Sequence, residues 1–206
     1  MIEIYTGTPG SGKSLHAVQS MKRWIEQFKL PVIANFDFRA KALKNKGYGS
    51  FFKIPNDKLC PDVLIRFSEE YRKLRNYEHV PEDEILLVVD EAQIIWNSRS
   101  WQSKDRGDWI SFFTQHRKLG YKIIMIAQYI DMLDKQMRSV IEYEHMHRKV
   151  SNIGMGGKIM SFIMGGNLHV DIKIYVPLNE KVGKEFYRAD KRLCKLYDSY
   201  TSFTRT

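Results

Sequence analysis

A glycine-rich loop near the amino terminus constrains the fold more than any other feature of this 206-residue sequence. Residues 7–14 read GTPGSGKS and match G-x-x-x-x-G-K-[ST] in full. An alternating, β-rich segment at 2–5 precedes the loop, and a stripe of apolar residues three or four apart predicts a helix from Gly12 to about Phe28. Strand, loop and helix in this order form the phosphate-binding start of a βαβ unit. The sequence therefore predicts an α/β fold on a mainly parallel sheet flanked by helices.

This loop predicts a binding site for a nucleoside triphosphate. Its glycines let the backbone wrap closely around a phosphate, and the following helix adds free N–H groups and the positive end of its dipole. Lys13 is expected to reach the β- and γ-phosphates, and the Ser14 hydroxyl is expected to coordinate Mg²⁺. The predicted nucleotide-binding residues are Gly7, Thr8, Pro9, Gly10, Ser11, Gly12, Lys13, Ser14 and Leu15.

A pair of carboxylates follows a continuous apolar run. Asp90 and Glu91 come directly after Ile85–Val89, which predicts a strand buried on both faces. Asp90 is expected to hold Mg²⁺ through water, and Glu91 to orient and deprotonate the water that attacks the γ-phosphate. A residue that activates water favours a motor-type NTPase over a small-molecule kinase. The Asn-Lys-x-Asp motif with which a GTPase reads its base is absent from the sequence.

Two further residues are predicted to act on the γ-phosphate. The strand Ile123–Ala127 ends at Gln128, whose amide is a candidate sensor of the γ-phosphate or a candidate to position water. Arg117 lies just before Gly120, where a helix is expected to end, and it is a candidate arginine finger. We expect Arg117 at one edge of the sheet, within reach of the γ-phosphate of an adjoining subunit. A solvated helix cap is the alternative role for this arginine.

The remaining segments complete the expected layout of a single domain over residues 1–206. In the nucleotide-binding core, residues 1–142, we expect a second strand at 31–36 and an exposed basic excursion at 39–60. A helix is expected at 63–77, and a further buried strand at 121–127. In the appended part, residues 143–206, we expect antiparallel strands at 146–150, 158–163 and 169–176, separated by glycine turns. A basic amphipathic helix is expected to follow at 184–197.

Charge and composition narrow the classes of partner. Lys and Arg number 33 against 24 Asp and Glu, which gives a formal charge of +9. This excess favours anionic partners such as nucleic acid or an acidic membrane face, with a merely solvated basic surface as the alternative. The basic segment 39–58 is the candidate contact for single-stranded DNA, where Phe51 and Phe52 either stack on bases or enter the core. No apolar stretch approaches the roughly 18 residues of a membrane span, so a soluble chain is expected.

Several of these stretches resemble a known family. IYTGTPGSGKS, VVDEAQ, HRKLGYKIIMIAQ and the terminal YDSY are similar to the N-terminal ATPase domain of the zonula occludens toxin family, the filamentous-phage gene I assembly proteins. The resemblance covers essentially the whole chain. The pattern of arginine, glycine, strand and glutamine over residues 117–128 is also similar to that of hexameric DNA-translocating ATPases of the FtsK and HerA type.

The resemblance implies a RecA-like P-loop NTPase fold and hydrolysis of ATP with Mg²⁺. The functional positions of the family fall on residues already named: nucleotide binding on the loop, metal and water on Asp90 and Glu91, the sensor on Gln128 and the finger on Arg117. Two alternatives stay open at this point. One is a small-molecule or nucleotide kinase, and the other is a nucleotide-gated binding module that hydrolyses little.

For the whole machine, the resemblance implies a homo-oligomeric ring, with a hexamer as the candidate, at the cytoplasmic face of the host inner membrane. There, ATP hydrolysis would power phage assembly and extrusion, with single-stranded DNA and phage coat proteins as candidate partners. Family members continue into a membrane span and an outer domain, whereas this sequence stops at Thr206. Membrane association is therefore expected through a segment absent from this chain, and toxin activity has no sequence here to carry it.

Overall fold

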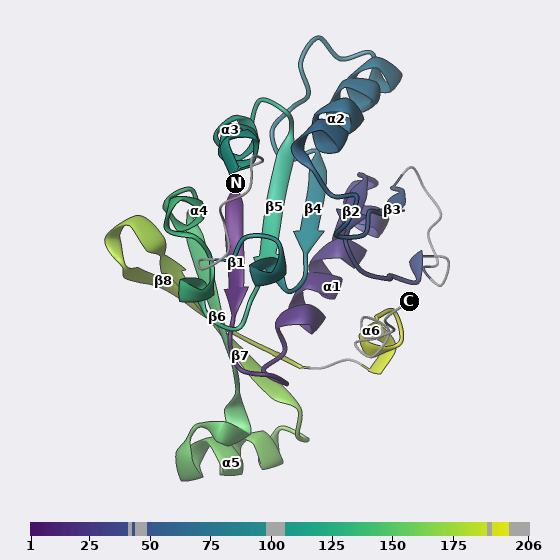
Figure 1. Cartoon of the computed structure of the whole chain (residues 1–206). Coiled ribbons are helices and arrows are strands. Elements are labelled where there is room, and N and C mark those ends of the chain that lie inside the picture. Colours follow the sequence, from purple (N-terminus) through teal and green to yellow (C-terminus); the bar gives the residue numbers. More distant parts are fainter. Residues whose placement is uncertain (41–42, 44–48, 98–105, 189–190, 198–206) are drawn as a thin grey trace.

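One sheet of eight strands organises the molecule (Figure 1). The computed structural model describes residues 1–40, 43, 49–97, 106–188 and 191–197. The strands are β1 (Ile2–Thr6), β2 (Val32–Ala34), β3 (Phe51–Lys53), β4 (Ile85–Val89), β5 (Tyr121–Ile126), β6 (Tyr143–Lys149), β7 (Leu168–Tyr175) and β8 (Glu180–Arg188). Their order across the sheet is β3-β2-β4-β5-β1-β6-β7-β8. Neighbours from β3 to β6 are parallel, and β7 and β8 are antiparallel, which confirms the predicted class of sheet.

Helices cover both faces of the parallel part of the sheet. They are α1 (Lys13–Arg23, continued by a π-helical turn over Trp24–Phe28), α2 (Pro61–Arg75), α3 (Arg106–Gln115), α4 (Lys135–Ser139) and α6 (Lys191–Cys194). A further helix, α5 (Gly154–Ile163), lies away from the sheet in the connection between β6 and β7 (Figure 1). Apolar residues of α1 and of the α6 segment pack in one core cluster, and those of α2, α3 and α4 pack in the other. None of the helices in the described ranges has both the length and the apolar character needed to cross a membrane.

The central strands are buried on both faces. In β4, Ile85, Leu87 and Val89 pack with the residues of α2 and α3, whereas Leu86 and Val88 pack with those of α1. All five are fully buried. This alternation confirms the sequence prediction, because a parallel strand with helices on both sides leaves no polar face.

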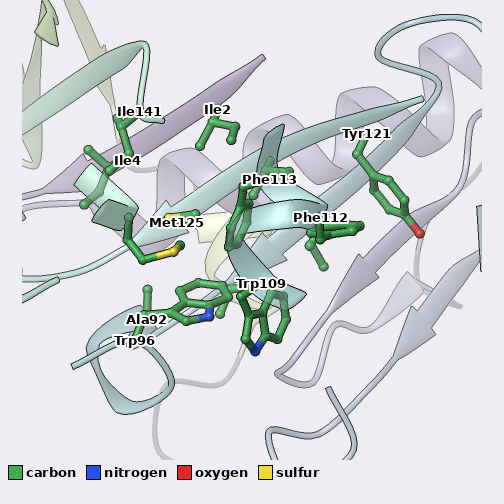
Figure 2. Packing of buried hydrophobic residues seen from close by; sticks show 14 of the residues in the cluster. Ile2, Ile4, Ala92, Trp96, Trp109, Phe112, Phe113, Tyr121, Met125 and Ile141 are labelled. Carbon is green, nitrogen blue, oxygen red and sulfur yellow. The ribbon is translucent and has the colours of Figure 1, made fainter. Parts of the chain in front are cut away.

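An aromatic cluster fixes the segment that follows β4 (Figure 2). The ring of Trp96 lies edge-on to Trp109 of α3 at a centroid distance of 5.0 Å, and Trp109 stacks on Phe113 at 5.5 Å. Such ring pairs contribute about 0.5–1.5 kcal/mol each beyond the burial of their area. The chain just after the two carboxylates is therefore anchored to α3.

The prediction of a strand at 158–163 is wrong, because this segment belongs to α5 (Figure 1). The glycine-rich stretch before it, expected to form turns, makes up the first half of the helix. β6 and β7 pair directly with each other over their whole length, so the connection between them has no free strand edge to join. A helix satisfies its backbone groups locally, and α5 does so while leaving Met155 and Phe162 80% and 86% exposed.

The prediction of a long helix at 184–197 is also wrong. Residues 180–188 form β8, which pairs antiparallel with β7 after a tight connection in which Asn179 has a φ of 52°. The open edge of β7 offers unpaired backbone groups, and pairing with them outweighs the helical pattern of the segment. Only Lys191–Cys194 is helical at this end of the described chain.

Two other segments differ from their predicted form. The excursion over 39–60 contains β3 and two buried side chains, Leu43 and Leu59, although residues 41–42 and 44–48 of it lie outside the described ranges. The strand expected at 146–150 is β6, which lies next to β1 and runs parallel to it. The parallel sheet therefore extends past residue 142, and its antiparallel part begins at β7.

Candidate functional site

The glycine-rich loop joins the carboxyl end of β1 to the first turn of α1, as predicted. Gly7 has a φ of 137°, and a Cβ built on it would lie 2.3 Å from the carbonyl oxygen of His147 in β6. A side chain at this position would therefore collide with the neighbouring strand. Thr8, Pro9 and Gly10 are exposed at the tip of the loop, and Ser11 is buried beneath it. The tip therefore presents its backbone to solvent, where a phosphate can approach it.

Lys13 begins α1 and points back over the loop. Its Nζ donates to the carbonyl oxygens of Gly7 at 2.5 Å and Thr8 at 3.2 Å. Burial lowers the pKa of Lys13, and the negative charges of Asp90 and Glu91 oppose that shift. The ammonium group is thus held at the mouth of the loop by carbonyl oxygens, and phosphate oxygens can replace them.

Ser14, in the first turn of α1, lies beside Asp90 at the end of β4, as the sequence predicts. The Ser14 hydroxyl donates to Asp90 Oδ2 at 3.5 Å. Burial raises the pKa of Asp90, while hydrogen bonds from the Tyr197 hydroxyl and the Glu91 backbone N–H lower it. A hydroxyl and a carboxylate are the oxygen ligands that Mg²⁺ takes in nucleotide sites, so the residues present fit this ion.

Glu91 projects away from the core beside this pair. Its backbone has a φ of 50°, and its exposed carboxylate accepts a hydrogen bond from the Gln93 side-chain amide. The left-handed turn separates the two neighbouring carboxylates, so Asp90 stays half-buried while Glu91 faces solvent. Glu91 is close enough to Lys13 to raise its pKa. An exposed carboxylate next to the phosphate loop can accept a proton from water.

Two residues without a predicted role support Asp90. Asn35 receives the Asp90 backbone N–H on its Oδ1 at 2.8 Å and donates from its Nδ2 to the Asp90 carbonyl at 2.8 Å. The Tyr197 hydroxyl donates to Asp90 Oδ2 at 2.8 Å. Asn35 follows the last residue of β2, the parallel neighbour of β4, so it lies beside Asp90 at the carboxyl ends of the two strands. A polar residue directly after a buried strand was the sequence signal that could have identified Asn35. Tyr197 belongs to the YDSY stretch, of which residues 198–200 lie outside the described ranges.

Gln128 lies directly beside the loop. Its backbone carbonyl accepts the N–H of Gly7 at 3.0 Å, and the residue helps to line a cavity of about 320 Å³ with Thr6, Thr8 and His147. This contact ties the end of β5 to the start of the loop. The sensor role predicted for the Gln128 amide stays a prediction.

Arg117 lies at the other end of the sheet from the loop. It precedes β5, whose Ile123 pairs with Ile2 at the start of β1, and its guanidinium contacts Glu142 Oε2 at 2.9 Å. β5 is an interior strand, and Arg117 lies at the edge of the sheet formed by the amino-terminal ends of the strands. Its role as an arginine finger stays a prediction. The side chain is half exposed and does not reach the loop of its own chain.

A cavity of about 370 Å³ opens between the loop, α1 and the carboxyl-terminal segment. Its lining includes Gly12, Lys13, Ser14, Leu15, Leu193 and Tyr197. Leu15, predicted to contact nucleotide, therefore lies at the site together with two residues from the end of the described chain. The apolar part of this lining suits the base and sugar of a nucleotide whose phosphates rest on the loop.

Comparison with known proteins identifies the family of this chain. The model of the zonular occludens toxin family matches residues 1–203. The chain belongs to this family. Among curated relatives, the gene 1 protein of Enterobacteria phage M13 is 30% identical over 221 residues, which cover 98% of this chain and 60% of that protein. The gene 1 protein of Salmonella phage IKe is 29% identical over 175 residues, with 81% of this chain and 46% of that protein covered. The chain thus spans about 60% or less of the length of these zonular occludens toxin relatives.

Solved structures share the fold at low sequence identity. The N-terminal domain of zonular occludens toxin from Neisseria meningitidis has a TM-score of 0.54 at 21% identity, covering 96% of this chain and 98% of that one. B204, the DNA-packaging ATPase of Sulfolobus turreted icosahedral virus, has a TM-score of 0.54 at 11% identity, with 92% and 97% covered. A further ATPase domain has a TM-score of 0.58 at 8% identity, with 93% and 81% covered. These likenesses confirm the predicted P-loop ATPase fold.

Proposed function

We propose that this chain is an ATP-hydrolysing motor domain that powers phage assembly and the extrusion of phage with its single-stranded DNA. One observation carries the proposal: the loop lysine, the Ser14 hydroxyl and the two carboxylates Asp90 and Glu91 lie in one site, although they come from distant parts of the sequence. Membership of the zonular occludens toxin family and the likeness to gene 1 proteins of filamentous phages support the biological setting.

The site residues divide the work of phosphoryl transfer. The backbone of the loop and the Lys13 ammonium would hold the β- and γ-phosphates, and Ser14 with Asp90 would hold Mg²⁺, which supplies positive charge to the phosphate oxygens when bound. Glu91 would orient a water and take its proton. Asn35 fixes the backbone of Asp90 from both sides, so the carboxylate keeps its place during turnover.

The position of Arg117 supports a motor that works as a ring. The arginine and the loop lie at opposite ends of the same parallel strands, so head-to-tail contact between subunits can bring the arginine of one to the γ-phosphate of the next. A guanidinium supplied in this way neutralises charge that develops in the transition state. We therefore propose a homo-oligomeric ring in which hydrolysis requires neighbours.

The wider setting is part of the same proposal. The formal charge of +9 favours contact with single-stranded DNA or another polyanion during extrusion. We propose work at the cytoplasmic face of the host inner membrane, together with phage coat proteins, and the likeness to the gene 1 proteins of phages supports this setting. Salt-dependent binding of single-stranded DNA by the purified chain is the expectation that goes with this setting.

The test of the proposal separates nucleotide binding from hydrolysis. Glu91→Gln should bind ATP with wild-type affinity and lose about 10²–10⁴-fold in turnover, because it removes the proton acceptor and keeps the shape of the side chain. Lys13→Ala should lose ATP binding itself. Binding is measured with a fluorescent ATP analogue, and turnover by phosphate release without any acceptor substrate.

Glu69→Gln is the matched control, since Glu69 is an exposed carboxylate on α2, outside the residues that line the site. It should leave both measurements unchanged. Near-normal hydrolysis in Glu91→Gln would refute the role of this residue and shift the function towards a kinase. Wild-type ATP affinity in Lys13→Ala would show that the loop does not bind phosphate.

A further inference from the structure

Three ligand-bearing side chains converge behind the phosphate loop. His16 lies in the first turns of α1, His147 in β6 and Asp171 in β7, and one ligand atom from each lies within 4.8 Å of the others. We call these three residues the His–His–Asp cluster. It is distinct from the Ser14 and Asp90 pair, because it lies on the β6–β7 side of the loop.

His147 has the orientation of a metal ligand. Its Nδ1 donates to the backbone carbonyl of His145 at 2.7 Å, which places the remaining lone pair of the neutral ring on Nε2. That Nε2 faces His16 Nδ1 at 2.8 Å. A histidine that ligates a metal commonly donates its other ring N–H to a carbonyl or carboxylate, since this hydrogen bond fixes the tautomer and the orientation of the ring. The structure therefore holds His147 in a single tautomer with its acceptor nitrogen aimed into the cluster.

Asp171 supplies the negative charge. The residue is only 4% exposed, and its Oδ1 has no hydrogen-bond partner within the described part of the chain. Its Oδ2 accepts a hydrogen bond from His145 Nδ1 at 2.5 Å and lies 3.9 Å from His16 Nδ1. A buried carboxylate oxygen without a partner is costly, and a bound cation is one way to satisfy it.

Without a metal, one proton has to join the two histidines, with His16 Nδ1 donating to His147 Nε2. A bound cation would displace that proton from His16 Nδ1, and the neutral His16 ring would then carry its N–H on Nε2, so that His16 Nδ1 and His147 Nε2 each offer a lone pair. Ligand atoms around a tetrahedral Zn²⁺ lie about 3.3 Å apart. The His16–His147 and His16–Asp171 separations of 2.8 and 3.9 Å bracket that value, and the His147–Asp171 separation is no more than 4.8 Å, so side-chain rotations can bring the three ligand atoms to it.

We propose that His16, His147 and Asp171 bind one Zn²⁺ ion, which ties α1 to β6 and β7 behind the phosphate loop. Imidazole nitrogens with one carboxylate are zinc ligands in proteins, and the fourth position would hold a water. Redox chemistry at a two-histidine, one-carboxylate iron site needs open positions for substrate. His147 is 1% exposed, and the ring of Tyr5 stacks on His16 at 4.9 Å, so a substrate has no access to this cluster from solvent.

The zinc site has a mechanical consequence for the loop. The backbone N–H of His16 donates to the Gly12 carbonyl at 3.0 Å, and a Cβ built on Gly7 would lie 2.3 Å from the His147 carbonyl oxygen. The two histidine ligands therefore hold both ends of the loop that spans residues 7–12. A metal that fixes their separation would hold the loop open for phosphate and transmit movement of β6 and β7 to it.

The experiment measures metal binding by the full chain directly. Metal-free protein is titrated with Zn²⁺ in competition with a chromophoric chelator, and with Co²⁺ while the visible spectrum is followed. Wild type should bind about one Zn²⁺ per chain, and Co²⁺ should give the intense bands of tetrahedral coordination. Thermal unfolding should move up by about 5–10 °C when free Zn²⁺ is about 100 times its Kd.

Matched variants identify the ligands. His16→Gln and His147→Gln should each weaken Zn²⁺ binding by more than about 100-fold, because loss of a ligand exceeds the 10–100-fold cost of losing its supporting residue. His116→Gln changes a buried histidine outside the cluster and should bind like wild type. Asp90→Asn, in the nucleotide site, should also retain the metal.

If a glutamine variant fails to fold, His16→Cys decides, since a thiolate also ligates zinc. Its Co²⁺ complex should gain a sulfur-to-metal charge-transfer band that wild type lacks. The proposal is overturned if wild type binds much less than one Zn²⁺, if Co²⁺ shows only weak octahedral bands, or if His116→Gln and Asp90→Asn lose the metal as strongly as the cluster variants do. A His16→Cys complex without the new band overturns it as well.

Discussion

Gly7 is the loop position at which the structure predicts the largest effect of adding one methyl group. Its φ is 137°, and a Cβ there would lie 2.3 Å from the backbone carbonyl oxygen of His147. Gly10, in the same loop, has a φ of 74°, but nothing lies within 4 Å of a Cβ built on it. Replacing each glycine by alanine therefore imposes backbone strain in both cases and steric overlap in only one.

The expected losses of stability follow from backbone strain and steric overlap. In Gly7→Ala, strain costs about 1–3 kcal/mol, and moving the carbonyl of β6 adds about 1–3 kcal/mol, so the free energy of unfolding should fall by about 2–6 kcal/mol. In Gly10→Ala only strain applies, and the loss should be about 1–2 kcal/mol. For a domain of this size each kcal/mol lowers Tm by about 2–4 °C.

The assay is urea unfolding followed by circular dichroism, with thermal unfolding as the second readout. The two variants should differ in midpoint at unchanged slope, with Gly7→Ala the less stable. Equal losses of stability in the two variants would refute the claim that β6 packs against the loop at Gly7. A stable Gly7→Ala would refute the loop conformation itself.

The remaining predictions concern two residues at opposite ends of the sheet. Burial raises the pKa of Asp90, and the hydrogen bond from Tyr197 lowers it, so Tyr197→Phe should move the acid limb of the pH profile of ATP hydrolysis to higher pH. An unshifted limb would contradict the role of this hydrogen bond. Arg117→Ala should bind ATP normally and lose on the order of 10³-fold in turnover, whereas Glu142→Gln breaks the same ion pair and should stay active. Wild-type turnover should rise faster than linearly with protein concentration, and strict proportionality below and above assembly would exclude a finger from a neighbour.

Local sequence determined the phosphate loop and the buried strands. Residues 7–14 fold next to the strand and helix that flank them in the chain, so one short window contains the whole phosphate cradle. The apolar run of β4 likewise predicts burial on both faces and places Asp90 at the end of a central strand. These features depend on neighbours in sequence, and the periodicity of side chains is enough to find them.

Tertiary structure decided what depends on neighbours in space. Residues 158–163 are helical because β6 is already paired with β1 and β7, and residues 180–188 form a strand because one edge of β7 was open, which no local pattern contains. Asn35 reaches Asp90 because the strand order places β2 beside β4, and His16 meets His147 and Asp171 because β6 lies beside β1 and β7 beside β6. Tyr197 reaches Asp90 because the segment after α6 packs back on the residues after β2, where Tyr197 bridges to Phe38. The sequence names each of these side chains, but the pairing of strands far apart in the chain brings them within bonding distance.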